Sequence, residues 1–213
     1  MPWPSSRTPG QTGGVFTWTV MPAPGPIGAL TVGATAAGLA LVAFGDHPEA
    51  AAQAAERLGL PAVAHEPARS NRQAAAEPGQ RGEAGAPDAE AVLERAVAQL
   101  REYFGGGRRV FDVPLDWSLT RGSQRRVLET LFTTVGYGAT ATYGELAARS
   151  ELGSAHTAAR GVGAIMGSNP LPVVVPCHRV MAADGLGGFG GGRSTKEWLL
   201  AHEGVLTGAL DFG

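Results

Sequence analysis

The sequence contains very little cysteine: Cys177 is the only one among 213 residues. One thiol excludes an intramolecular disulfide and a zinc site built from several cysteines. Apolar runs are short, since none approaches the roughly 18–20 residues that cross a bilayer, and the N-terminus lacks an apolar signal segment. The net charge of −2 excludes a strongly basic surface over the whole protein, so any contact with nucleic acid must be made by a local basic patch. These absences predict a cytoplasmic protein with a reduced thiol and no membrane partner.

The surroundings of the thiol favour a chemical role. Cys177 stands in the run Pro176-Cys177-His178-Arg179, directly after the apolar residues 173–175. The apolar run predicts a buried strand that ends at the thiol. A lone thiol is either inert filling in a core or a nucleophile. The fixed proline before it and the polar residues after it favour the nucleophile.

The first part of the chain predicts a small sheet with helices and no catalytic constellation. A disordered leader is expected over 1–14, then a domain over 15–115 with a flexible insertion at 65–87. The strands of an antiparallel sheet are expected at 15–20, 29–35 and 38–44, and helices at 50–58 and 88–104. Asp88 is a candidate N-cap for the second helix, which the glycines 105–107 would end.

The second part, 116–213, predicts mostly helix. Ser123 is a candidate cap for a helix that ends near 136–138, and Thr142 and Glu145 have capping-box spacing at the start of a helix through Arg149. A further helix is expected over 155–166, so the pair has helix-turn-helix character. The small residues of the second helix would let it approach another surface closely, but composition alone favours ordinary close packing between helices. Ser194 and Glu197 are a candidate capping box for the last helix, with Glu203 in its final turn.

Several motifs occur in a fixed order in this second part. They are Tyr143, Ala158-Ala159-Arg160-Gly161-Val162-Gly163, Asn169-Pro170-Leu171-Pro172, Pro176-Cys177-His178-Arg179-Val180, and a glycine-rich loop before Lys196-Glu197-Trp198-Leu199-Leu200. Together they resemble the O6-alkylguanine-DNA alkyltransferases (methylated-DNA–protein-cysteine methyltransferases), strongly over 124–204 and more weakly over 16–115. The resemblance implies an α/β (α+β) fold, in which a small N-terminal sheet-and-helix domain precedes a mostly helical C-terminal domain with a helix-turn-helix.

The resemblance also implies the chemistry. Cys177 would accept an alkyl group irreversibly from O6-alkylguanine in double-stranded DNA, with O4-alkylthymine as an alternative lesion. A soft thiolate suits this transfer, and His178 would act as its base through a water molecule, held by Glu203. Asn169 would tie the helix-turn-helix to the cysteine segment. A monomer would act once, without a metal or organic cofactor.

A base buried in a duplex must be flipped out to reach a pocket. By the same resemblance, Arg160 would fill the gap in the base stack, Tyr143 would help rotate the nucleotide, and the small residues Ala158, Ala159 and Gly163 would let the helix enter the minor groove. The pocket would be formed by Pro172, Val180, Phe189 and Gly190. Phe189 departs from the family pattern, which usually has tyrosine in that loop.

Two other functions remain open from the residues alone. A helix-turn-helix protein could bind alkylated bases without removing them, although relatives that do so lack the cysteine. A cysteine hydrolase could use Cys177, His178 and Glu203, and it would turn over repeatedly.

Overall fold

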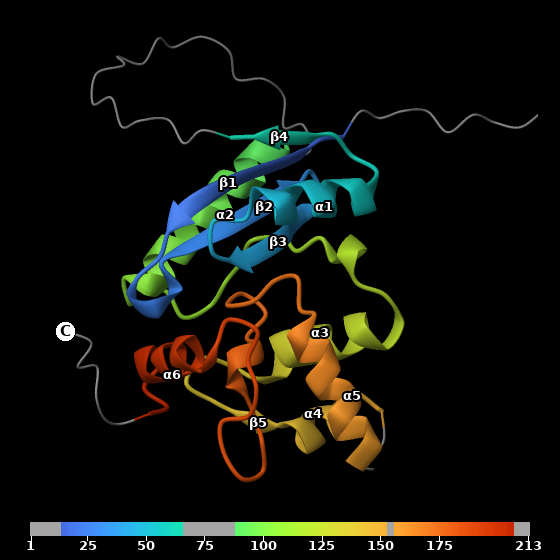
Figure 1. The fold of residues 1–213 in the computed structure, drawn as a ribbon, viewed down its shortest axis with the longest axis vertical. Coiled ribbons are helices and arrows are strands. Elements are labelled where there is room, and N and C mark those ends of the chain that lie inside the picture. Colours follow the sequence, from blue (N-terminus) through green and yellow to red (C-terminus); the bar gives the residue numbers. More distant parts are fainter. Residues whose placement is uncertain (1–13, 66–87, 153–155, 207–213) are drawn as a thin grey trace, which may run out of the picture.

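The first half of the chain forms a four-stranded sheet (Figure 1). The computed structural model describes residues 14–65, 88–152 and 156–206, so the predicted leader, apart from Gly14, and 66–87 of the predicted insertion lie outside it. The strands are β1 (Phe16–Pro22), β2 (Ala29–Thr35), β3 (Gly38–Phe44) and β4 (Ala62–Ala64), in the order β3-β2-β1-β4. The three predicted strands pair antiparallel, and β4 adds a parallel edge beside β1.

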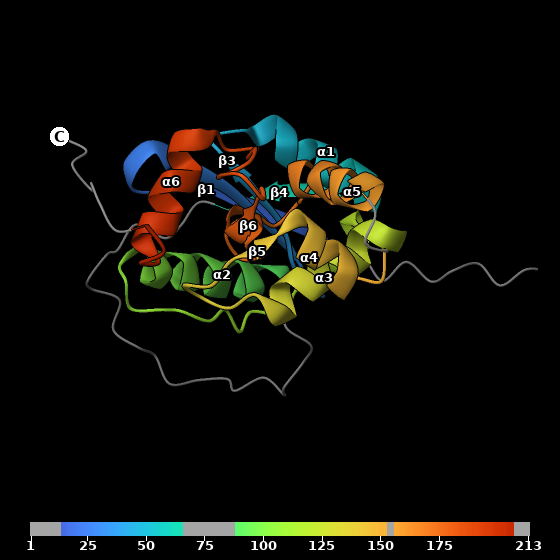
Figure 2. The ribbon, with the colours of Figure 1, turned by 90° about the horizontal axis from the view of Figure 1, so that it is seen from below.

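Two helices, α1 (Pro48–Leu58) and α2 (Ala89–Phe104), cover opposite faces of this sheet (Figure 2). Alternate side chains of a strand point to opposite faces, so Leu30 packs in the cluster that contains α2, and Phe16 packs in the cluster that contains α1. Gly33 leaves room for the Phe16 ring, since a Cβ there would lie 2.2 Å from it. The sheet is therefore a two-sided core element.

The ends of α2 are those that the sequence predicts. Asp88 Oδ1 accepts a hydrogen bond from the Ala91 amide at 2.7 Å, which satisfies one of the free donors of the first turn. Gly105 is the residue that follows the last turn. The side chain of Tyr103, in that last turn, is fully buried.

The second half is mostly helical. Its elements are α3 (Gly122–Thr134), β5 (Ala141–Thr142), α4 (Tyr143–Arg149), α5 (His156–Gly167), β6 (Val180–Met181) and α6 (Arg193–His202). The predicted capping box is present, because Thr142 Oγ1 accepts from the Glu145 amide at 3.1 Å and the Glu145 carboxylate accepts from the Thr142 amide at 2.7 Å. Helices α4 and α5 pack against each other, as a helix-turn-helix requires (Figure 1).

Two predicted caps are wrong. Helix α3 begins at Gly122 after Arg121, so Ser123 lies inside the first turn and makes no cap. Helix α6 begins after Gly192, whose φ of 86° turns the chain before Ser194 can act as the cap. Local sequence offers a capping side chain, but the backbone path into the helix decides whether it is used.

Glu197, the proposed partner in that second capping box, makes a different contact. Its carboxylate accepts a hydrogen bond from Arg193 Nε at 2.8 Å, one turn earlier on the exposed face of α6. An exposed ion pair of this spacing contributes only about 0.3–0.5 kcal/mol.

The two halves share one hydrophobic core. The amide of Val42 in β3 donates to Pro170 O of the second half at 2.8 Å, and the amide of Asp116 donates to Leu39 O at 2.9 Å. Buried side chains from the sheet, α2, α3 and the segment before the thiol belong to one cluster. The α/β class is confirmed, whereas a domain boundary at 115/116 stays a prediction. No helix among the described residues is both long and apolar enough for a membrane span.

Candidate active site

The valine run before the thiol is buried, but it is a turn and not the predicted strand. Val175 N–H donates to Leu171 O at 2.8 Å, and Val173 has a φ of 73°. Cys177 then begins a short 3-10 helix that ends at Arg179. An apolar run signals burial, and burial alone does not distinguish a strand from a covered turn. The turn places the thiol in the buried cluster that the two halves share.

Asn169 holds this turn at both ends. Its Nδ2 donates to Val175 O at 2.9 Å, and its Oδ1 accepts from the Leu171 amide at 3.0 Å. Asn169 lies two residues after the end of α5 at Gly167. The contact agrees with the predicted tie between the helix pair and the cysteine segment, although its role in the reaction stays a prediction.

His178 and Glu203 meet in the buried interior. His178 Nε2 lies 2.8 Å from Glu203 Oε1, and both side chains are fully buried. A carboxylate only accepts, so Nε2 carries the hydrogen and Nδ1 is left as an acceptor. Among the described residues, His178 Nδ1 has no hydrogen-bond partner. Burial lowers the pKa of His178 below its ordinary value, against the opposing effect of Glu203, so the imidazole is neutral at pH 7.

Two further side chains bind the same carboxylate, and sequence reasoning missed both. Arg179 donates from Nε to Glu203 Oε2 at 2.8 Å and from Nη2 to Oε1 at 2.9 Å, which is the paired geometry that suits a carboxylate. Tyr103 Oη lies 2.7 Å from Oε1. The position of Arg179 in the Pro-Cys-His-Arg run could have indicated that it belongs to the site. No local pattern pointed to Tyr103.

Burial controls the ionisation of the thiol. It raises the pKa of Cys177 to about 11, although the side chain of Asn169 and the charge of Lys196 oppose this. Lys196 is the only lysine of the chain, which uses arginine at every other basic position. Its Nζ donates to Val180 O at 2.6 Å and to Leu186 O, and burial lowers its pKa to about 8. The resting thiol is protonated at pH 7, so its proton must leave during any reaction.

Replacing Lys196 by methionine should make the thiol harder to ionise. The variant Lys196→Met keeps an unbranched side chain but removes the positive charge that favours the Cys177 thiolate. We expect alkylation of Cys177 by iodoacetamide at a fixed pH to slow by roughly tenfold, which corresponds to about one pKa unit. Intact-protein mass spectrometry across a pH series measures this. An unchanged rate would show that the charge does not reach the thiol.

A pocket of about 400 Å³ lies beside the helix pair. Its lining residues are Tyr143, Gly163, Met166, Gly167, Gly188, Phe189 and Gly190. The structure thus brings together Tyr143, Gly163, Phe189 and Gly190 from the predicted set. The volume lies within the range of about 300–1,000 Å³ that is typical of small-molecule sites.

The thiol lies close to this pocket but does not line it. Cys177 is 5% exposed. Burial, and then the nearby Cys177, raise the pKa of Tyr143, and Tyr143 Oη donates to Gly188 O at 3.2 Å. Pro172 and Val180 are buried and do not line this cavity, so their predicted place in the substrate pocket stays a prediction. Both belong to the buried run 171–180, whose side chains pack into the core.

Phe189 is fixed by the first half of the chain. Its ring packs edge-on against Phe44 at the end of β3, with a centroid distance of 5.4 Å. The family usually has tyrosine in this loop, and phenylalanine keeps the ring but lacks the hydroxyl. The contact with Phe44 gives this ring an apolar partner. Phe44 had no sequence signal for a place at the site.

Helix α5 presents an open face next to the pocket. Arg160 is exposed, and a Cβ added at Gly161 or Gly163 would meet nothing within 4 Å. Ala158 and Ala159 are half-buried on the same helix. Arg160 and Gly163 are three positions apart and so lie on one side of the helix. Arg160 therefore lies on the side of α5 that carries Gly163, a residue of the pocket lining.

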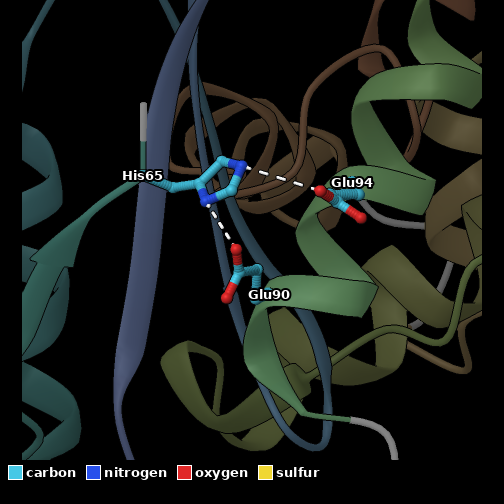
Figure 3. Close-up of side chains that lie close together, drawn as sticks. All are labelled: His65, Glu90 and Glu94. Carbon is cyan, nitrogen blue, oxygen red and sulfur yellow. Dashed lines mark ion pairs between the residues drawn. The ribbon is translucent and has the colours of Figure 1, made fainter. Parts of the chain in front are cut away.

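A second group of polar side chains lies between the end of β4 and the first turns of α2 (Figure 3). His65 Nδ1 is 3.1 Å from Glu90 Oε1, and His65 Nε2 is 3.8 Å from Glu94 Oε1. These residues are a possible metal-ligand set within the described ranges, with two exposed carboxylates. The His65 amide donates to Trp18 O at 2.7 Å, so His65 continues β4 and is not the start of the insertion. This cluster is separate from the cysteine site.

The described residues thus form an α/β protein in which a buried thiol, a histidine–carboxylate pair and an exposed helix lie near a small pocket. Two family models match almost the whole described chain. Residues 18–117 match the 6-O-methylguanine DNA methyltransferase, ribonuclease-like domain, and residues 122–205 match the 6-O-methylguanine DNA methyltransferase, DNA binding domain. The chain belongs to the 6-O-methylguanine DNA methyltransferase family, so the resemblance drawn from its motifs is confirmed.

Individual relatives agree with this assignment. A methylated-DNA–protein-cysteine methyltransferase of Mycolicibacterium paratuberculosis is 50% identical over 111 residues, which are 51% of this chain and 63% of the relative. The mouse protein of that name is 51% identical over 86 residues, which are 39% of each chain. The chain thus spans less than two thirds of these curated relatives. Mycobacterium tuberculosis OGT in complex with DNA has a TM-score of 0.61 and 31% identity, covering 88% of this chain and 92% of that one.

Proposed function

We propose that this protein repairs alkylated double-stranded DNA by moving the alkyl group of O6-alkylguanine to Cys177. The observation that carries the proposal is the contact of 2.8 Å between His178 Nε2 and Glu203 Oε1, directly beside the only thiol of a chain in this family. The contact fixes the hydrogen on Nε2 and leaves Nδ1 free to take a proton. Relatives named methylated-DNA–protein-cysteine methyltransferases support the same activity.

The step balances without a cofactor. The thiol proton passes to His178 Nδ1, and the sulfur attacks the alkyl carbon of the lesion. A carbon–sulfur bond forms while the bond between that carbon and O6 breaks. The guanine leaves with the electron pair and takes up the proton, so His178 ends neutral. The product is a thioether on Cys177, which is not hydrolysed, so each molecule acts once.

Burial supports a role for Glu203 in this step. Burial disfavours a charged imidazole. The carboxylate at 2.8 Å lowers that cost while the proton is on His178. Arg179 balances the charge of Glu203 in the resting state, so this carboxylate is not left as an uncompensated buried charge before the thiol ionises.

The pocket and α5 support the route of the base. A flipped guanine would enter the pocket lined by Tyr143 and Phe189 and reach Cys177 after the contact between Tyr143 and Gly188 opens. The backbone carbonyl of Val180, a residue of the predicted pocket, already accepts from Lys196 Nζ and keeps a second lone pair that could accept from the guanine amino group. Action as a monomer in the cytoplasm stays a prediction.

Mass spectrometry of the intact protein tests the proposal. After incubation with an excess of duplex that contains O6-methylguanine, we expect one added methyl group per molecule, located on the peptide that carries Cys177. No addition would overturn the proposal. An unmodified protein with repeated product release would favour a hydrolase, and tight binding without transfer would favour a lesion-binding protein.

Replacing Arg160 by alanine should slow transfer from duplex DNA far more than transfer from the free base. Only the duplex leaves a gap that a side chain must fill, and flipping costs a few kcal/mol. We expect a loss of roughly tenfold or more for the duplex. The variant Arg101→Ala removes the same charge from an exposed position on α2 and serves as the control. Equal slowing with both substrates would contradict the role of Arg160.

A further inference from the structure

The carboxylate of Glu203 receives a hydrogen bond from the first half of the chain. Tyr103 Oη donates to Glu203 Oε1 at 2.7 Å across a separation of 100 residues. The other described donors to this carboxylate are His178, Arg179 and the amide of Gly138, all from the second half. The sheet domain therefore reaches the cysteine site through the hydroxyl of Tyr103.

Tyr103 is held rigidly at this place. Its ring is fully buried and packs against Phe104 and Phe111, with centroid distances of 5.3 and 5.4 Å. Its backbone carbonyl accepts from His202 Nε2 at 2.8 Å. Tyr103 thus binds two consecutive residues, His202 and Glu203, so the C-terminal ends of α2 and α6 are fixed to each other.

The hydroxyl acts on the oxygen that faces the histidine. Glu203 Oε1 accepts from Tyr103 and lies 2.8 Å from His178 Nε2. Arg179 binds both oxygens and already fixes the plane of the carboxylate. Burial, and then the charge of Glu203, raise the pKa of Tyr103 far above its ordinary value, so the hydroxyl stays protonated. Its effect is therefore on the charge of Oε1 rather than on the orientation of the group.

We propose that Tyr103 acts on the cysteine site through Glu203: its hydroxyl shares Glu203 Oε1 with His178 and sets how strongly that carboxylate favours the protonated imidazole. The inference rests on the proposed function, in which His178 takes the thiol proton. Without the hydroxyl, more negative charge on Oε1 remains for His178, so the imidazole is protonated more easily. A histidine that is already protonated cannot act as the base, so transfer should fail at a higher pH.

Other ionisable groups also face this pair, and the substitution Tyr103→Phe leaves their side chains unaltered in chemistry. They are Cys177 and Arg179 beside His178, Lys196 and His202 on α6, and Tyr137 and Arg109, whose ring and guanidinium lie next to each other. Their charges act on the original protein and on the variant alike, so they cancel in a comparison of the two.

The test compares Tyr103→Phe with Tyr137→Phe. The control also loses a hydroxyl from the same aromatic cluster, but Tyr137 Oη donates to His202 O at 3.0 Å and does not touch Glu203. The rate of methyl transfer to Cys177 is measured against pH. We expect the acid limb of Tyr103→Phe to move up by about one pH unit, a tenfold change in the protonation equilibrium, and that of Tyr137→Phe to stay. Coinciding limbs for Tyr103→Phe and the original protein would overturn the inference.

A second pair of measurements keeps the two proposals separate. If the original protein transfers no methyl group, the proposed function fails, and NMR titration of the His178 imidazole still tests the action of Tyr103. If Tyr103→Phe does not fold, 3-fluorotyrosine at position 103 keeps the ring and donates more strongly. The protonation of His178 should then shift to lower pH, and an unchanged titration would refute the role of Tyr103.

Discussion

Replacing Cys177 by serine should abolish methyl transfer from a duplex that contains O6-methylguanine. A hydroxyl is far less acidic than a thiol and is a poorer nucleophile toward an alkyl carbon. The proton cost is already high at this site, because burial raises the pKa of the thiol itself to about 11. We expect the transfer rate to fall by roughly 10⁴-fold or more, as removal of a nucleophile does in other enzymes.

Duplex binding is the control for Cys177→Ser. One oxygen replaces one sulfur at a position that is 5% exposed and away from the open face of α5. Binding measured by fluorescence anisotropy should therefore stay within about threefold of the original protein. Transfer that persists in the serine variant, or a methyl group found on another residue, would contradict the assignment of Cys177.

Among the substitutions considered, Glu203→Gln should lower the free energy of unfolding the most. The variant leaves the guanidinium of Arg179, which is 6% exposed, without its charged partner. Breaking a buried ion pair by removing one partner costs about 3–5 kcal/mol, which corresponds to a fall in Tm of roughly 10 °C for a chain of this size. Transfer should also slow by roughly tenfold or more, because the imidazolium loses its counter-charge.

An exposed pair offers a matched control for Glu203→Gln. Glu197 accepts from Arg193 on the surface of α6, so Glu197→Gln removes the same charge without stranding a buried one. Thermal unfolding of the two variants measures the difference. Equal Tm values would show that Arg179 finds another partner or remains solvated.

The stability of the protein should fall as the pH is lowered from 7 to 3. Burial alone would raise the pKa of Glu203, but hydrogen bonds from His178 and Arg179 hold it well below its ordinary value. This contribution is complete above the unfolded pKa of about 4.3 and is lost as the pH falls below it. His178 has a lowered pKa, so the unfolded chain gains its proton first, below about pH 6.5, and the free energy of unfolding decreases there too.

Urea unfolding at a series of pH values measures both effects. The original protein should lose stability in the two pH ranges, and Glu203→Gln should lose less than the original below pH 4.3, because glutamine does not titrate whereas the exposed carboxylates with a lowered pKa are present in both proteins. A profile for Glu203→Gln that is as steep below pH 4.3 as that of the original protein would place the acid sensitivity elsewhere.

The sequence predicts correctly those helix ends that depend only on residues close together in the chain. Asp88 caps α2, and Thr142 with Glu145 caps α4, because a capping side chain and its amide lie within three residues of each other. The predictions that Ser123 caps α3 and that residues 173–175 form a strand were wrong. A short stretch of sequence does not determine the direction from which the chain enters a helix, nor whether a strand finds a partner. The four-residue run around Cys177 located the candidate site.

The amino-acid sequence alone determined that the chain has one thiol with a histidine beside it, which helices frame it, and which family it resembles. Only the tertiary structure decided what surrounds Glu203 and how the thiol ionises. Tyr103 meets Glu203 from 100 residues away, and a contact between single residues so far apart leaves no periodic pattern to read. The pKa of Cys177 likewise depends on how fully the folded chain excludes water from the sulfur.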